Sequence, residues 1–147
     1  MILNRLRGFT LIELMVVVSI VGFLAMIAYP SYSNYMRQTR RSDAHIALLR
    51  LAADMEKFSS DCQAYPTSLT ADRTCATLGL GRPNALSPDS LYQLSVAVTA
   101  SGSRFTATAT PVAGQAQALD TACASFSITD LGAKTAWGTN PSSCWKK

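Results

Sequence analysis

The sequence is short of charged residues and of histidine. Of its 147 residues 15% are charged, and His45 is its single histidine. The four cysteines form no Cys-x-x-Cys pair, so a zinc site or a Cys/His nucleophile pair fits poorly. No Ser–His–Asp, paired-carboxylate or phosphate-loop pattern occurs in a plausible setting. The sequence therefore indicates a protein that is not an enzyme and that has no metal or cofactor.

The excess of positive charge is also small. Lys and Arg number 13 against 9 Asp and Glu, for a formal charge of +4. Arg5 and Arg7 stand in the first eight residues, and without that segment the balance is 11 basic against 9 acidic residues. Such an excess is too weak to predict nucleic-acid binding from charge. The 48% hydrophobic content argues against disorder.

Apolar residues are concentrated near the N-terminus. Phe9 to Tyr29 is a run of 21 residues with one charged side chain, Glu13. The run is long enough to cross a bilayer as a helix. No later stretch is comparable. The chain is thus expected to have a short basic leader, one membrane helix and a soluble region.

Two common interpretations of the first thirty residues fit incompletely. A cleaved signal peptide has an apolar core of about 7–15 residues and a small-x-small cleavage site. Here the apolar run is longer. Ala25 and Ala28 each have a large residue two positions before them, Phe23 and Met26, so neither completes a small-x-small site. A plain signal anchor explains the length. It does not explain Glu13, because a carboxylate in lipid is costly and usually has a partner.

Cleavage between Gly8 and Phe9 would give Glu13 a role. It would remove residues 1–8 and free the amine of Phe9, so that Glu13 becomes the fifth residue of the mature chain. The cationic amine of one subunit could then pair with Glu13 of another inside a helical bundle. Because breaking a buried ion pair is costly, this pair would act as a register device.

Residues 7–22, RGFTLIELMVVVSIVG, resemble the prepilin leader-peptidase motif of type IV pilins and type II secretion pseudopilins. The motif combines a Gly before the cut, a Phe after it and a Glu five residues into the mature helix. The resemblance implies cleavage by prepilin peptidase and N-methylation of Phe9. In this family Gly22 and Pro30 bracket a stretch that can lose helical bonds in the filament. Proline also predicts a kink by itself, because it lacks the backbone donor.

The helical pattern continues beyond Pro30. Apolar residues recur at spacings of 4, 3, 4 and 3, which is one face of a helix: Ala44, Leu48, Leu51, Met55 and Phe58. We expect one helix from Phe9 to about Ser60. Its first part, 9–29, would be the transmembrane and assembly segment, and 30–61 its amphipathic half. His45 and the cluster of Arg37, Arg40 and Arg41 are expected on the solvated face.

The remainder, residues 62–147, is expected to form a globular head. Residues 61–89 contain several Pro and Gly and predict a long loop. Alternating patterns predict strands at 91–100, 104–110 and 124–129, and a short fourth strand within 131–137. Ser101-Gly102 is a credible hairpin turn. The fold class is therefore α+β, with three or four antiparallel strands packed on the long helix.

The order of helix, loop, antiparallel sheet and Cys-bounded tail resembles a pilin fold. The closing segment, 123–145, is similar to the end of PilE-type minor pilins, in which a strand Cys pairs with a Cys just before a near-terminal Trp. Cys123 and Cys144 match those positions, and Cys62 and Cys75 can close the long loop. Four cysteines in an extracytoplasmic domain indicate two disulfides, although three connectivities are possible. Asp120 and Asp130 resemble the calcium ligands of some pseudopilins too weakly to predict a site.

The resemblance implies a type IV minor pilin precursor, a structural subunit assembled into or priming a pilus for adhesion or twitching motility. Its implied partners are other pilin subunits, the prepilin peptidase and the inner-membrane assembly machinery. The chain would cross the inner membrane once, with a periplasmic head, and become extracellular on assembly. Three alternatives stay open: a type II secretion pseudopilin, a DNA-uptake pilin and a plain membrane-anchored domain. Nucleic-acid binding is disfavoured by the small charge excess of the head.

Overall fold

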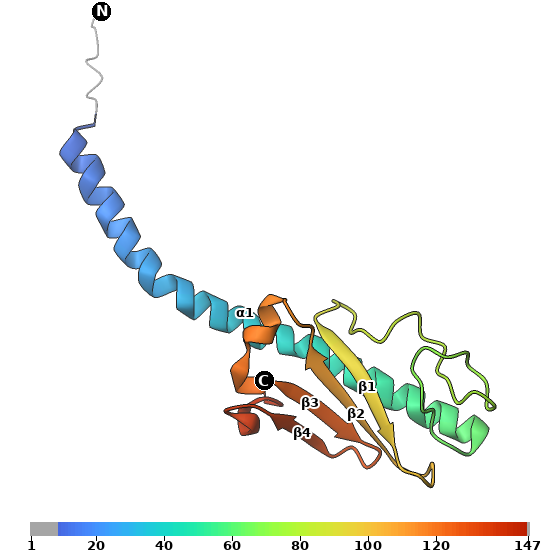
Figure 1. The fold of residues 1–147 in the computed structure, drawn as a ribbon. Coiled ribbons are helices and arrows are strands. Elements are labelled where there is room, and N and C mark those ends of the chain that lie inside the picture. Colours follow the sequence, from blue (N-terminus) through green and yellow to red (C-terminus); the bar gives the residue numbers. More distant parts are fainter. Residues whose placement is uncertain (1–8, 147) are drawn as a thin grey trace, which may run out of the picture. The chain divides into compact units, whose positions relative to one another are not determined.

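The computed structural model describes residues 9–146. Its first and longest element is a single helix (Figure 1). Helix α1 runs from Leu11 to Cys62 and is followed by four strands and three short 3-10 helices. The described chain divides into two compact units, and the division falls between Met36 and Arg37. The leader and Gly8, the residue expected before the cleavage site, lie outside the described residues.

The N-terminal unit contains the first part of α1 and exposes its apolar side chains. Every large apolar residue from Phe9 to Tyr29 is more than half exposed. Their helical pattern is apolar all round, which is typical of a helix that lies in lipid or in a bundle. By length and composition α1 is able to cross a membrane. The helix continues through Pro30, which lies inside it.

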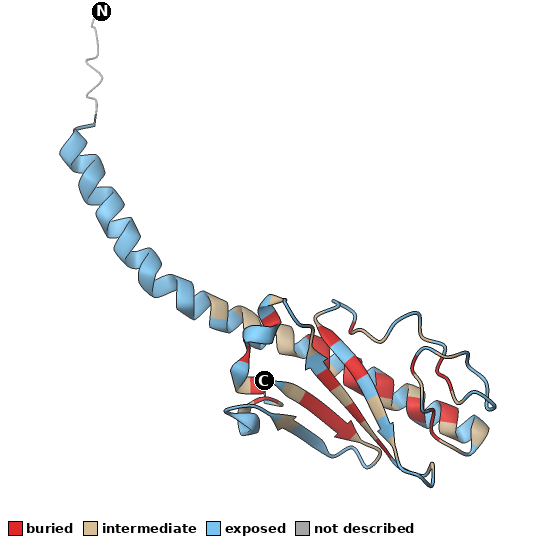
Figure 2. Ribbon diagram, viewed as in Figure 1, coloured by how far each residue is buried: buried red, intermediate tan, exposed pale blue. Residues whose placement is uncertain are grey.

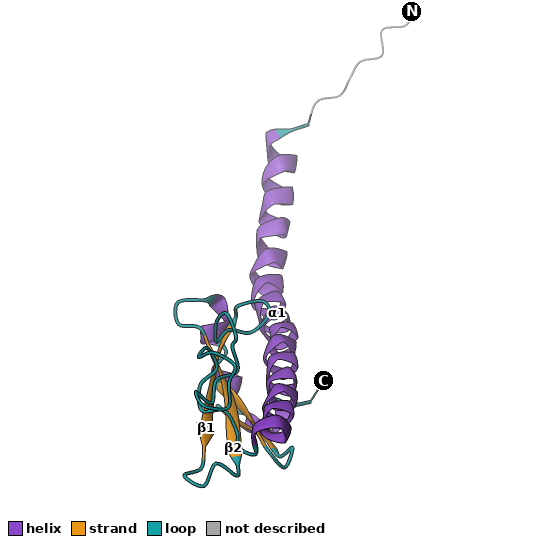
Figure 3. Cartoon of the chain, turned by 90° about the vertical axis from the view of Figure 1, so that its right-hand side faces the viewer, coloured by secondary structure: helices purple, strands orange, loops and turns teal. Residues whose placement is uncertain are grey.

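The C-terminal unit is built on a four-stranded antiparallel sheet in the order β1-β2-β3-β4 (Figure 1). The sheet lies beside the second part of α1 (Figure 3). The strands are β1 (Tyr92–Val98), β2 (Phe105–Pro111), β3 (Ser125–Thr129) and β4 (Lys134–Trp137). The 3-10 helices η1 (Ala116–Leu119) and η2 (Thr121–Cys123) connect β2 to β3, and η3 (Pro141–Ser143) follows β4. The predicted α+β fold, with its long helix packed on an antiparallel sheet, is confirmed.

The core lies between the sheet and the second part of α1 (Figure 2). All five residues of the predicted apolar stripe are at most 1% exposed: Ala44, Leu48, Leu51, Met55 and Phe58. Tyr92, Leu94, Phe105 and Phe126 meet them from the sheet. Burying a side chain of this size contributes about 1.5–3 kcal/mol. The spacing of the stripe therefore decides which face of α1 packs.

The segment between α1 and β1 has no helix and no ladder strand, as the sequence predicts, but close contacts order it. Tyr65 donates to the Glu56 carboxylate of α1 at 2.9 Å, and Leu80 is buried in the core. At Gly79 an added Cβ would lie 2.3 Å from the Ala71 carbonyl oxygen. Only glycine allows the backbone to approach so closely.

Candidate functional site

The N-terminus of α1 carries a reciprocal cap formed by Thr10 and Glu13. The Glu13 backbone N–H donates to Thr10 Oγ1 at 3.2 Å, and the Thr10 N–H and hydroxyl lie 3.4 and 3.3 Å from Glu13 Oε2. This is a capping box, in which the residue before the helix and its third residue satisfy each other's donors. The Thr-x-x-Glu spacing of a capping box is present in the sequence, so Glu13 has a local role besides the one predicted in assembly. The carboxylate thus has a local partner within its own chain.

Gly22 and Pro30 both lie inside α1, at positions exposed in the described part of the chain. A Cβ added at Gly22 would meet no other described atom within 4 Å. Pro30 removes the backbone donor that would bond the Met26 carbonyl. Their expected effect on the filament remains a prediction, because it concerns contacts with other subunits.

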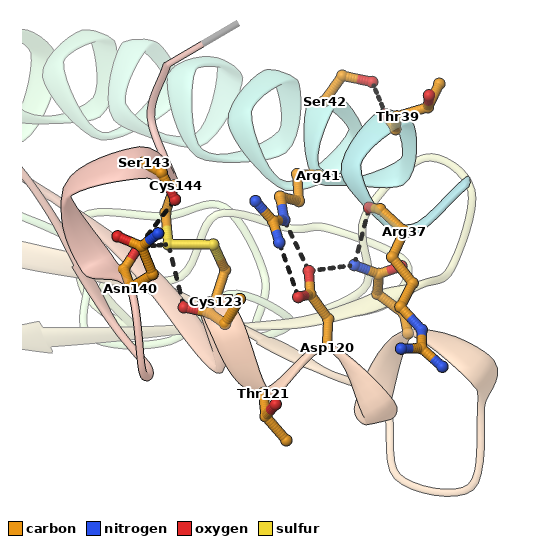
Figure 4. A network of polar contacts seen from close by, with 12 residues as sticks. Arg37, Thr39, Arg41, Ser42, Asp120, Thr121, Cys123, Asn140, Ser143 and Cys144 are labelled. Atoms are coloured by element: carbon orange, nitrogen blue, oxygen red, sulfur yellow. Dashed lines mark hydrogen bonds and ion pairs between the residues drawn. A yellow bond between two sulfur atoms is a disulfide. The ribbon is translucent and has the colours of Figure 1, made fainter. Parts of the chain in front are cut away.

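The four cysteines form two disulfides, Cys62–Cys75 and Cys123–Cys144. This is the pairing that the sequence analysis favoured among three connectivities. The first bond joins the end of α1 to the long loop. The second joins η2 to the segment after η3, and both of its cysteines are fully buried (Figure 4).

Arg41 and Asp120 form a buried ion pair at the start of the C-terminal unit (Figure 4). Arg41 Nε and Nη2 donate to the two Asp120 oxygens at 2.7 and 2.8 Å, and the side chains are 13% and 4% exposed. The hydrogen bond to Asp120 raises the pKa of Arg41 above its usual value, against the opposing effect of burial. The expectation that Arg41 faces solvent is therefore wrong, since the sequence could not show its distant partner.

Gln117 extends this contact into a small network. Its Nε2 lies 2.8 Å from the Tyr92 hydroxyl, 3.2 Å from Asp120 Oδ2 and 3.3 Å from the Arg37 carbonyl oxygen. Its Oε1 has no hydrogen-bond partner among the described residues. Burial is the main reason that the pKa of Tyr92 lies well above its usual range. The network is structural, because the Gln117 amide nitrogen links β1, the η1–η2 segment and α1.

Neither acidic residue considered for calcium is available to a metal ion. Asp120 is held by Arg41, and Asp130 lies 3.2 Å from Arg104 Nε. In the part of the chain that the structure describes, no group of three or more His, Cys, Asp or Glu residues could hold a metal ion.

Asp43 fixes the end of the long loop to α1. It is 5% exposed and accepts from the Ser87 hydroxyl at 2.5 Å and from the Asp89 N–H at 3.1 Å. Ser87 Oγ in turn accepts from the Tyr92 N–H at 3.0 Å, where β1 begins. A buried carboxylate thus sets the point at which the loop enters the sheet.

His45 contacts the C-terminal tail and is not the surface residue that the sequence predicts. Its Nε2 lies 3.0 Å from the Cys144 carbonyl oxygen, and its ring stacks on Trp145 at 4.4 Å between centroids. Since a carbonyl oxygen only accepts, Nε2 carries the proton in this contact. Burial lowers the pKa of His45 below its usual value. The hydrogen bond to Cys144 raises this pKa, and the positive charges of Lys134 and Arg41 lower it further.

Arg41, Asp43 and His45 lie within one turn of α1 and fasten three different segments. These segments are η1–η2, the loop before β1 and the C-terminal tail. None of the three links was visible in the sequence, because the partners lie between 44 and 99 residues away.

Comparison with protein families gives two matches. Residues 3–29 match the prokaryotic N-terminal methylation motif. Residues 30–127, more than half of the chain, match the family described as "Type IV minor pilin ComP, DNA uptake sequence receptor". The chain belongs to this family of type IV minor pilins. The predicted identity as a type IV pilin is thereby confirmed.

Individual pilins support the same assignment. The pilin is 34% identical over 104 residues to the fimbrial protein EcpC of Eikenella corrodens, across 71% of this chain and 61% of that protein. It is 43% identical over 61 residues to the type IV major pilin PilA of Myxococcus xanthus, across 42% of this chain and 28% of that protein. This pilin therefore spans less than two thirds of the length of these relatives.

A solved structure of a type IV pilin from Shewanella oneidensis is similar in fold. The TM-score is 0.51 at 25% sequence identity, and the match covers 76% of this pilin and 99% of that chain. Pilins are structural subunits that assemble with one another, which agrees with the long apolar helix of this chain.

Proposed function

We propose that this pilin is a minor subunit of a type IV pilus, anchored in the inner membrane by residues 9–29 until they enter the filament core. The observation that carries the proposal is the exposed apolar segment at the start of α1, which lies within the matched methylation motif. A side-chain surface of this kind needs lipid or the helices of other subunits to cover it. The head would be periplasmic before assembly and extracellular afterwards.

Processing by prepilin peptidase is part of the same proposal. The peptidase would cut between Gly8 and Phe9 and the Phe9 amine would be methylated. Mass spectrometry of the mature N-terminus tests this step. We expect a chain that begins at Phe9 with one extra methyl, and no cleavage in Gly8→Val. A mature chain beginning near Ser31 would instead mean a secretory signal peptide.

Incorporation tests the structural role itself. Filaments sheared from cells should contain the mature chain in small amounts beside a major pilin. Its presence only in the membrane, with secretion of an exoprotein lost on deletion, would favour the type II pseudopilin alternative. Its presence only in the membrane, with secretion unchanged on deletion, would favour a plain membrane-anchored domain.

A second candidate is DNA uptake, favoured by the printed description of the matching family. Two cations of the head are already paired, because Arg82 lies 3.6 Å from Asp54 and Arg104 lies 3.2 Å from Asp130. Exposed Arg73, Lys134 and Lys146 would have to supply the contacts to phosphate.

Duplex DNA titrated into the full mature chain in detergent, at 50 and 200 mM NaCl, tests this candidate. Binding should weaken with salt, and replacing one of these three cations by Ala should reduce the salt slope by about 1. Unchanged binding in all three variants, or no binding at 50 mM NaCl, would reject DNA uptake and leave the pilus role intact.

A further inference from the structure

The sheet has a second face, opposite α1, that assembly through α1 does not use. Along each strand the side chains alternate, and the inward positions are filled by core residues such as Leu94, Ala107 and Phe126. The residues between them therefore point outward. These outward residues are Gln93, Ser95 and Ala97 on β1; Thr106, Thr108 and Thr110 on β2; Ser125, Ser127 and Thr129 on β3; and Thr135 and Trp137 on β4.

No residue at these outward positions is charged, and most carry a hydroxyl group. Pairing places Ser95, Thr108, Ser127 and Thr135 in one row across all four strands. Ala97, Thr106 and Thr129 form the next row. Ser127 is only 1% exposed and its hydroxyl shares a hydrogen bond with that of Thr135, so it offers no group to a ligand. The hydroxyls of Ser95, Thr106 and Thr108 can both donate and accept hydrogen bonds, so they can bind groups of either kind. We call this surface the hydroxyl face.

A hollow lies at one end of the hydroxyl face, beside the β1–β2 hairpin. Its volume is about 480 Å³, within the range of small-molecule sites. The residues that line it include Ala97, Thr106, Arg104, Asp130 and Leu131. The hollow thus combines apolar surface with a guanidinium donor and a carboxylate acceptor.

The hollow is electrically balanced. Arg104 Nε lies 3.2 Å from Asp130 Oδ2, so the cation is matched by its neighbouring carboxylate. With no charge at the outward strand positions, the whole surface has nothing to attract a polyanion or a polycation. A neutral partner therefore suits this surface better than a charged polymer.

Two exposed apolar side chains complete the surface. Trp137 is 58% exposed and shares the outward face of β3 and β4 through its pairing with Ser125. Leu131 is 75% exposed at the hollow. Between Thr129 and Ser125 the face extends about 13 Å along β3. An indole ring offers an apolar platform, and sugar rings present C–H faces that pack on such platforms.

We propose that the hydroxyl face binds a neutral polysaccharide, with one sugar ring in the hollow between Arg104 and Leu131 and another stacked on Trp137. The vicinal hydroxyls of the first ring would accept from Arg104 and donate to Asp130. This activity goes beyond the assembly role and does not depend on it, since the face belongs to a single subunit.

The test uses the full mature chain in a detergent without a sugar headgroup. It is applied to an array of neutral glucan, galactan, mannan and chitin oligosaccharides, with heparin and duplex DNA as anionic probes. We expect at least one neutral oligosaccharide to bind, with an affinity that changes less than twofold between 50 and 500 mM NaCl. Trp137→Ala and Arg104→Gln should each weaken that binding at least tenfold.

Substitutions at two exposed residues away from the hydroxyl face serve as matched controls. The variants Leu119→Ala and Arg50→Gln should bind the oligosaccharide as tightly as the wild type does. Circular dichroism of each variant verifies that the fold is kept. Failure of every neutral oligosaccharide to bind would overturn the proposal. Equal binding by Trp137→Ala and Leu119→Ala would overturn it too. So would binding restricted to heparin or DNA.

Discussion

Arg41 and Asp120, 79 residues apart in the sequence, form a two-pronged ion pair with N–O distances of 2.7 and 2.8 Å. The contact joins α1 to the end of η1 and the start of η2, and little solvent reaches it. Both prongs of the guanidinium are used, a geometry that lysine cannot reproduce. The pair therefore holds the connection between β2 and β3 against the helix.

Removing one member of this pair should destabilise the C-terminal unit strongly. Asp120→Ala leaves the buried guanidinium without a counter-charge, and we expect a loss of about 3–5 kcal/mol. Chemical denaturation of the full chain in detergent measures it. Arg50→Ala, at an exposed position of the same helix, should cost well under 1 kcal/mol. Equal losses in the two variants would mean that the pair does not stabilise the unit.

His45 should make stability depend on pH. Its pKa in the folded protein lies below the usual value of 6.5, so the unfolded chain takes up the proton first as the pH falls. The stability that neutral His45 contributes is present above about pH 6.5 and is lost as the pH falls below that value. Melting temperatures between pH 7.5 and 5 should decrease less in His45→Phe than in the wild type. Parallel curves for the two proteins would contradict this.

The Cys123–Cys144 disulfide should stabilise the tail. It closes a loop with a sequence separation of 21 and supports the segment in which Trp145 stacks on His45. Replacing both cysteines by Ala should cost about 3 kcal/mol by loop entropy. It should also change the fluorescence of Trp145. Peptide mapping of the non-reduced protein checks the pairing, and a Cys62–Cys123 crosslink would refute it.

Phe58 should be far more sensitive than an exposed residue on the same helix. Its ring is 1% exposed in the core, and Arg73 lies over it at 5.9 Å. We expect Phe58→Ala to lower the free energy of unfolding by about 3–5 kcal/mol. The exposed Lys57 beside it is the control, since Lys57→Ala should cost well under 1 kcal/mol. Thermal melts compare the two, and small shifts in both would argue against packing of α1 on the sheet.

Thr10 and Glu13 allow the capping role to be separated from the proposed register role. Glu13→Leu should leave membrane insertion intact or improved and should reduce incorporation into filaments, because the charge pair with a Phe9 amine is lost. Thr10→Ala breaks the capping box and keeps that charge. Its incorporation should therefore stay close to the wild type. If both variants lose incorporation equally, the cap alone explains Glu13.

Local patterns in the sequence determined the long helix, its buried face, the strands and the pilin class of this protein. The 21-residue apolar run indicated a helix able to cross a membrane, and its flanking motif indicated the pilin class. The 3–4 spacing of Ala44 to Phe58 indicated the buried face, and alternation indicated the strands. These features are readable because helix and strand periodicities depend on neighbours a few residues away.

Only the tertiary structure decided the roles of the polar residues. Arg41 and His45 looked like surface residues, because their type and their local sequence match those of a solvated face. Their partners lie 79 to 99 residues away, and no periodicity links residues over such separations. The folded chain pairs them because a polar group enclosed by packing costs free energy unless it is hydrogen-bonded. The packing of the sheet on α1 therefore determines which polar residues become hydrogen-bond partners, and local sequence patterns do not.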